Sequence, residues 1–256
     1  MPGDTRRRGA VTEVADGVHR IEHASVNVYL VTDAEGRVLM VDTGLPGTWD
    51  VLGRALRRLG RRPSDVAAVV LTHAHFDHTG SASRAQSVLG VPVWLHREDF
   101  PVAAHPYRYA HENVRALYPL RHPAAVPILA SMVAAGALRV PGVRGARHAE
   151  PGSVLPVPGA PRVVFTPGHT AGHCALHLPD RDVLITGDAL VTLDPYTGRR
   201  GPQVVAGAAT ADSAEALRSL DRLAETGATT LLPGHGEPWS GPVADAVAQA
   251  REVGAH

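Results

Sequence analysis

The sequence predicts a mixed α/β fold in which two β-sheets pack against each other and helices cover their outer faces. Three observations predict it. Short apolar runs typical of strands occur in both the first and the last third of the 256 residues, and stripes of apolar residues at helical spacing follow them in each third. Hydrophobic residues make up 44% of the chain and charged residues 20%, which is enough apolar surface for one large core. We therefore expect a single domain over residues 1–256.

The first third is predicted to form a hairpin followed by a helix. Residues 26–31 and 38–41 are apolar runs separated by a polar turn at 32–36, which is a hairpin signal. We expect a helix next, with Thr48 as its cap and Gly60 at its end. Its apolar stripe consists of Leu52, Ala55, Leu56 and Leu59.

Three further elements follow in the first hundred residues. Residues 66–71 form a continuous apolar run, as expected of a strand buried on both faces. A histidine-rich run comes directly after it. Residues 81–89 are then predicted to form a helix and residues 91–95 another strand.

The segment 97–150 has a different composition, rich in His, Pro, Tyr and Arg. Its clearest helical piece is 124–138, and 141–152 is predicted to be a loop. We interpret the segment as an insertion that lies over the functional site as a lid, although a plain surface excursion stays open.

The last third repeats the order of strands and helices. Asp212 and Glu215 form a capping box at the start of a predicted helix over 212–225, and a closing helix is expected over 242–253. The predicted strands are 154–157, 162–166, 174–178, 183–186 and 229–232.

Composition excludes several classes of function. All 25 basic residues are arginine and balance 25 acidic ones, so no charge favours nucleic acid or an anionic membrane as a partner. The absence of lysine excludes a Schiff-base mechanism. Cys174, the one cysteine, is expected to be a small core residue. With neither a signal peptide nor an apolar run long enough to span a membrane, we expect a cytoplasmic protein with a small-molecule substrate. The sequence does not indicate an oligomeric state.

The run Thr-His-Ala-His-Phe-Asp-His at 72–78 carries the chemistry. Imidazole nitrogens and carboxylate oxygens are the ligands that zinc and similar divalent ions prefer. If a strand ends at Thr72, His73 and His75 point the same way and suit one metal ion. Asp77 and His78 follow as the chain turns into a helix, and they suit a second ion beside the first.

Three more residues of a kind that binds metal occur later in the sequence, and their local surroundings are alike. His169, Asp188 and His235 each follow a short apolar run and a small residue at a predicted strand end. Any one of them alone is better explained as a core histidine or a turn aspartate. Three in the same context favour a shared metal site.

Taken together, these motifs resemble the metallo-β-lactamase superfamily, from about Gly17 to Trp239. The resemblance implies a four-layer αββα sandwich with its site at one edge between the sheets. It also implies a structural role for Asp42, which would support the metal loop from behind the ligands.

The resemblance further implies a dinuclear centre, with zinc favoured and iron as the alternative. The first ion would take His73, His75 and His169, the second Asp77, His78 and His235, and Asp188 would bridge them. A hydroxide shared by two ions about 3.5–4 Å apart would attack the carbonyl of an ester, lactone or thioester. Asp77 would shuttle the proton.

Two residues have weaker assignments. Tyr196 follows Asp188, and some lactone-cleaving relatives place a tyrosine near the substrate carbonyl, so a catalytic role is one interpretation and a turn tyrosine the other. His173 is interpreted either as a support for a ligand or as a loop histidine.

Alternatives remain open within the same fold. Persulfide dioxygenases hold one iron at the equivalents of His73, His169 and Asp188 and are oxidoreductases, not hydrolases. A β-lactamase is less favoured because no export signal is visible. A non-catalytic binding protein is disfavoured because no ligand type is missing.

Overall fold

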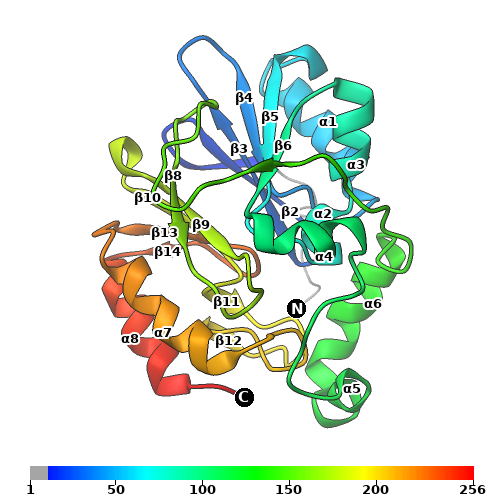
Figure 1. Ribbon diagram of the computed structural model, residues 1–256, viewed down its shortest axis with the longest axis vertical. Helices are drawn as coiled ribbons and strands as arrows, with labels where there is room; N and C mark the ends of the chain where they lie inside the picture. Colours follow the sequence, from blue (N-terminus) through cyan, green and yellow to red (C-terminus); the bar gives the residue numbers. More distant parts are fainter. Residues whose placement is uncertain (1–10) are drawn as a thin grey trace, which may run out of the picture.

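Two β-sheets lie face to face between two layers of helices in the computed structural model, which describes residues 11–256 (Figure 1). The first sheet has the strand order β1-β2-β3-β4-β5-β6-β7 and the second the order β14-β13-β10-β9-β8. A short ribbon pairs β11 with β12. The predicted αββα sandwich is therefore confirmed. Within the described residues no helix is long and apolar enough to cross a bilayer.

The strands are β1 (Val11–Ala15), β2 (Val18–His23), β3 (Val26–Thr32), β4 (Val38–Val41), β5 (Val66–Val70), β6 (Val93–Leu95), β7 (Arg147–His148), β8 (Arg162–Phe165), β9 (Cys174–Leu178), β10 (Val183–Gly187), β11 (Val191–Leu193), β12 (Arg200–Gln203), β13 (Thr230–Pro233) and β14 (Trp239–Ser240). The α-helices are α1 (Thr48–Arg58), α2 (Phe76–Thr79), α3 (Ala82–Arg84), α4 (Phe100–Ala104), α5 (Tyr118–Arg121), α6 (Val126–Ala134), α7 (Ser213–Ala224) and α8 (Val243–Val253).

The core between the sheets follows from the two-residue period of a strand. In β4, Leu39 and Val41 face the second sheet, where they join a buried cluster with Leu176 and Ile185. The alternate residue Met40 joins a different cluster on the outer face, beneath α1. This buried strand thus contributes to two cores.

Helices cover the outer faces with the apolar stripes that the sequence indicates. Leu52 and Leu56 of α1 pack in the cluster on the first sheet. Leu220 of α7 and Val247 of α8 pack in the cluster on the second sheet. Asp212 caps α7 by accepting the backbone N–H of Glu215 at 2.8 Å. Glu215 does not complete the predicted capping box, because the Asp212 N–H donates to Gly168 O and the Glu215 carboxylate pairs with Arg218.

Some local predictions were wrong. Thr48 does not cap α1: the cap position is Gly47, and the Thr48 hydroxyl accepts the Leu45 N–H instead. The segment 154–157 is not a strand, since only Val154 forms a bridge, to Arg162. The helix predicted over 81–89 is α3 continued by a π-helical turn, Ala85–Leu89.

The segment 97–150 leaves the first sheet after β6 and returns to it as β7, which pairs with β6 in parallel. Its helix α6 packs beside the start of β3 and the loop after β4: Met132, and Ala135 just after the helix, share a cluster with Val26 and Leu45. Figure 1 shows α5 and α6 on the opposite side of the molecule from α7 and α8.

Candidate metal centre

Strand ends bring the predicted ligands together. The run that starts at Thr72 follows β5, His169 follows β8, Asp188 follows β10 and His235 follows β13. The register makes β10 parallel to β13 and antiparallel to β9, which is antiparallel to β8. The carboxyl ends of β8, β10 and β13 therefore share one edge of the second sheet.

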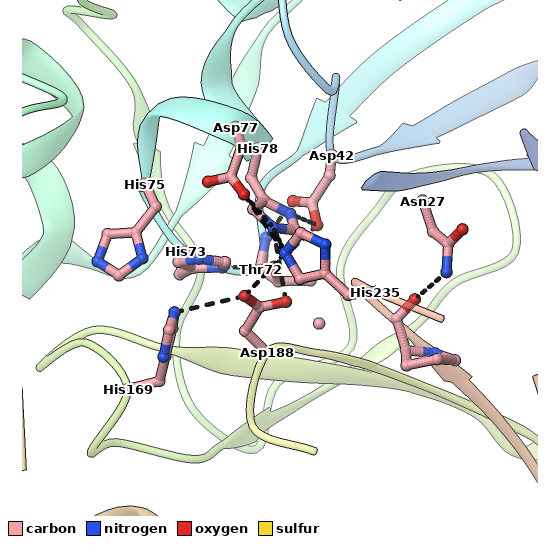
Figure 2. A network of polar contacts seen from close by, with 12 residues as sticks. Asn27, Asp42, Thr72, His73, His75, Asp77, His78, His169, Asp188 and His235 are labelled. Carbon is pink, nitrogen blue, oxygen red and sulfur yellow. Dashed lines mark hydrogen bonds and ion pairs between the residues drawn. The ribbon is translucent and has the colours of Figure 1, made fainter. Parts of the chain in front are cut away.

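All seven predicted ligands lie in one buried cluster (Figure 2). Three groups within it have ligand atoms within 4.8 Å of one another and could each hold a metal ion. These groups are His73 with His75 and His169, His73 with His78 and Asp188, and Asp77 with His78 and His235.

Asp188 lies between the two sets of histidines. Its Oδ2 is 3.5 Å from His169 Nε2 and 3.3 Å from His235 Nε2. Its Oδ1 is 3.5 Å from His78 Nε2. One carboxylate thus faces both halves of the cluster.

The histidines are oriented by bonds on their outer nitrogens. His78 Nδ1 donates to Asp42 Oδ2 at 2.9 Å, and His235 Nδ1 donates to the Ser25 carbonyl at 2.6 Å. His169 Nδ1 is 3.2 Å from the Thr210 hydroxyl, which itself donates to Val205 O. These bonds fix the rings of His78, His235 and His169 with Nε2 facing inward, as in metal sites.

Four of the inward atoms make no hydrogen bond to any residue in the described range 11–256. Nε2 of His73, His75 and His169 and Oδ1 of Asp188 are buried without a hydrogen bond. An unsatisfied buried polar atom costs about 1–3 kcal/mol, so four of them in one place require an explanation. A divalent cation fits, because it accepts lone pairs from neutral imidazole and carboxylate together.

Electrostatics divide the cluster into a half of neutral histidines and a half dominated by carboxylates. Burial lowers the pKa of His73 and His75 well below the usual value, and that of His169 to about 3, which keeps these rings neutral. Burial also opposes charge on His78, but Asp188, Asp42 and Asp77 raise its pKa to about 9. The carboxylate half of the cluster therefore attracts positive charge, either as protons or as metal ions.

Asp42 supports the ligand run from behind, the role expected from the resemblance. It follows β4 in a left-handed backbone conformation, with φ of 58°. Its carboxylate accepts Thr72 N–H at 2.8 Å, the Thr72 hydroxyl at 2.9 Å and His78 Nδ1. One side chain thus holds both ends of the run.

Asp99 has a supporting role that the sequence did not indicate. Its buried carboxylate accepts Ala74 N–H at 2.9 Å, the Thr170 hydroxyl at 2.8 Å and Gly172 N–H at 2.8 Å. It therefore ties the loop of His73 and His75 to the loop of His169. No spacing in the sequence links residue 99 to either loop.

The two ambiguous residues and the cysteine have defined places. His173 lies in the loop just before β9 but is fully buried, and its Nε2 accepts the Asp188 N–H at 3.0 Å, so it is not a partly exposed histidine. Cys174 is buried in the core between the sheets, and burial raises the pKa of its thiol. Tyr196 is partly exposed and packs beside Tyr109.

Tyr109 brings the 97–150 segment to the cluster. Its ring stacks on His75, with centroids 3.8 Å apart and an interplanar angle of 35°. The Arg115 guanidinium lies 4.0 Å from the same ring centroid and donates from Nε to Ala208 O. The sequence indicated aromatic residues in this segment, but not which of them reaches a ligand.

Comparisons with known proteins agree with this geometry. The family model described as "Metallo-beta-lactamase superfamily" matches residues 22–235. A Bacillus subtilis (strain 168) protein named "Probable metallo-hydrolase YflN" is 29% identical over 252 residues, which cover 94% of this chain and 92% of that protein. An N-acyl homoserine lactonase from Bacillus sp is 26% identical over 242 residues, covering 80% and 83%. A crystal structure of a metallo-beta-lactamase family protein from Thermus thermophilus superposes with a TM-score of 0.67 at 28% identity, covering 94% of this chain and 80% of that one.

Proposed function

Because the chain belongs to the metallo-β-lactamase superfamily and is a metal-dependent hydrolase, we propose that it cleaves an ester, lactone or thioester at a dinuclear zinc centre. The first ion would be held by His73, His75 and His169, and the second by Asp77, His78 and His235. The observation that carries the proposal is the place of Asp188, whose two oxygens face both sets.

The chemistry that the two ions would supply does not depend on the details of this protein. Two divalent ions would supply water acidic enough to give hydroxide near neutral pH and would polarise a substrate carbonyl. The protein's own contribution is to position the substrate and to move a proton.

Asp77 is proposed to move that proton. Its Oδ2 lies 3.3 Å from His235 Nε2, and of the seven predicted ligands it keeps the largest exposed fraction, 7%. A carboxylate there can accept a proton as water attacks the carbonyl carbon and pass it to the departing oxygen or sulfur.

Tyr196 is proposed to donate a hydrogen bond to the substrate's carbonyl oxygen. A tyrosine hydroxyl bears its proton at neutral pH, and burial of this one raises its pKa further above the usual value, so the group can donate. The hydroxyl lies within hydrogen-bond reach of Tyr109. It stands in the turn between β11 and β12, and the Asp194 side chain accepts its backbone N–H at 2.8 Å.

The 97–150 segment is proposed to be a lid within a single domain. Besides the stacking of Tyr109 on His75, Glu112 accepts the N–H and the hydroxyl of Ser213, and Asn113 N–H donates to Gly207 O. These contacts join the segment to the loop before α7 and to the first residue of that helix. Such a cover excludes water and shapes the substrate site.

Metal content and activity test the proposal together. We expect about two zinc ions per chain in protein purified without added metal, and hydrolysis of at least one of an aryl ester, a lactone and an acyl thioester. One iron per chain with oxygen uptake on a persulfide would instead support a mononuclear dioxygenase and overturn the proposal.

Variants test the ligand assignment. His169→Ala and Asp188→Ala are expected to abolish turnover and reduce metal content while the far-ultraviolet circular dichroism stays that of a folded protein. His177→Ala, on β9 outside the cluster, is the matched control and is expected to keep activity. Full activity in either ligand variant would refute the assignment.

A further inference from the structure

A cavity of about 600 Å³ lies beside the metal centre, on the outer side of His235. The turn that joins β2 to β3, the helix α6 and the ribbon of β11 and β12 surround it. Ser25, whose carbonyl accepts His235 Nδ1, and Gly236, next to His235, are part of its wall. Its volume is within the range of small-molecule sites, about 300–1,000 Å³.

The wall of this cavity is polar, unlike that of most ligand sites. Among the described residues of its wall, Leu193 is the only large apolar side chain, and the other apolar contributors are alanines. Its charged residues are Arg20, Glu22, Arg200 and Glu237. An alkyl chain would therefore find little apolar surface here, whereas a charged or oxygen-rich group would find partners.

Three of the four charged groups already have partners. Arg20 donates from Nε to Asn27 Oδ1 at 2.9 Å and pairs with Glu237. Glu22 accepts the Ser25 N–H at 2.9 Å within its own turn. Arg200 is exposed and makes no side-chain hydrogen bond, ion pair or ring contact with any residue in the described range 11–256.

We propose that this cavity receives the part of the substrate remote from the reacting carbonyl, and that Arg200 pairs there with a carboxylate on that part. The inference rests on the proposed hydrolase function and narrows its substrate to an ester, lactone or thioester that carries a carboxylate. A guanidinium suits a carboxylate because its N–H groups match the two oxygens in one plane.

A matched pair of substrates tests the inference. The 4-nitrophenyl esters of hexanoic acid and of adipic acid have the same leaving group and six-carbon acyl chain, and only the second ends in a carboxylate. For the wild-type protein we expect kcat/KM to be about 10-fold higher for the adipate ester, the effect of one charge-assisted hydrogen-bonded pair. The preference should shrink as ionic strength rises, because salt screens exposed charges.

Arg200→Gln is expected to abolish that preference, so that the adipate and hexanoate esters have about the same kcat/KM. Arg199→Gln is the matched control, because it removes the same charge from the neighbouring exposed position, which is not part of the cavity wall. Adipate itself provides a readout besides turnover: it should bind the wild-type protein and Arg199→Gln more tightly than Arg200→Gln in calorimetry.

A neutral chain-length series gives a second arm. If an apolar wall held the acyl chain, each buried methylene would raise kcat/KM about fourfold. From butanoate to octanoate esters we expect less than about a twofold rise per methylene, because the wall offers little apolar surface.

The outcomes separate the two proposals. Absence of hydrolysis of every ester, lactone and thioester by metal-loaded protein would overturn the proposed function. Hydrolysis with equal rates for the two six-carbon esters, or with a steep rise along the neutral series, would leave that function standing and overturn the role of Arg200.

Discussion

His256 lies 2.9 Å, through its Nε2, from the carboxylate of Asp194, which is fully buried. The same carboxylate accepts the backbone N–H of Tyr196 at 2.8 Å and of Ala206 at 3.2 Å. The carbonyl of His256 also accepts the Gly207 N–H at 2.9 Å. His256 therefore acts on Tyr196 through Asp194, as a positioning residue.

Replacing His256 with alanine is expected to lower kcat several-fold with little change in KM, because the turn that presents Tyr196 loses one of its supports. His256→Gln, which keeps a donor, should restore most of the rate. His105→Ala, at an exposed position of the 97–150 segment, is the control and should behave as wild type. Equal loss in the alanine and glutamine variants would contradict a role for this hydrogen bond.

The contact between His256 and Asp194 predicts that the stability of the fold depends on pH. The hydrogen bond to Asp194 raises the pKa of His256 above its usual 6.5. A raised histidine pKa stabilises the fold below the unfolded value and loses that effect as pH rises through the folded value. Denaturation midpoints of wild type and His256→Ala should therefore differ most below pH 6.5 and converge as pH rises through the raised pKa of His256.

Asp42→Asn is expected to weaken metal binding about 10–100-fold, because it removes a carboxylate that orients a ligand from behind. The amide keeps the shape but cannot accept from Thr72 and His78 as the carboxylate does. A competition assay with a chromogenic chelator measures the change, and Asp50→Asn on the exposed face of α1 is the control. Unchanged metal affinity in Asp42→Asn would show that the ligands do not need Asp42 to orient them.

Asp99→Ala is expected to destabilise the fold by about 1–3 kcal/mol or more, because it leaves the Ala74 and Gly172 N–H groups without an acceptor. Metal affinity should fall with it, since the two ligand loops lose their shared tie. Urea denaturation and metal titration measure the two effects. Glu98→Ala, an exposed neighbour, should change neither.

Gly80→Ala is expected to destabilise the fold by about 1–3 kcal/mol through overpacking. A Cβ at Gly80 would lie 2.5 Å from the backbone of Gly44 and Leu45, which cannot move aside as a flexible side chain can. Gly53→Ala within α1 is the control: its Cβ would meet only Arg57 at 3.7 Å, and better helix propensity should stabilise it by about 0.5–1 kcal/mol. If Gly80→Ala were as stable as the wild-type protein, α2 would have to shift away from the turn at Gly44.

Removing metal is expected to lower the melting temperature, because ions that bind only the folded chain stabilise it by mass action, about 2.7 kcal/mol at 100 times Kd. The physical reason is the four buried atoms of the cluster that make no hydrogen bond within the described part of the chain. Thermal melts with and without a chelator measure the shift. An identical melting temperature would argue against metal at these residues.

The sequence predicted best the helices whose apolar residues form a stripe on one face and the strands whose residues are all apolar. Helix α7 has both a capping residue and an apolar stripe, and β5 is apolar throughout. Strand β2 was not expected, since Val18 and Ile21 are buried but the residues between them are only partly so, which breaks the two-residue period. The segment 154–157 looked like a strand and is not one, because apolar residues alone do not decide pairing.

The sequence by itself determined the kinds of ligand and their positions at strand ends, because a short run such as His73 to His78 carries its chemistry locally. Only the tertiary structure decided that Asp188 faces both histidine sets, that Asp99 ties two ligand loops and that Tyr109 stacks on His75. It also decided that Arg200 lines the cavity without a side-chain partner among the described residues. Each of these relationships depends on packing between segments far apart in the chain. No local pattern of residues encodes such packing. The surroundings of the metal centre, where we propose that substrate binds, are formed by this packing.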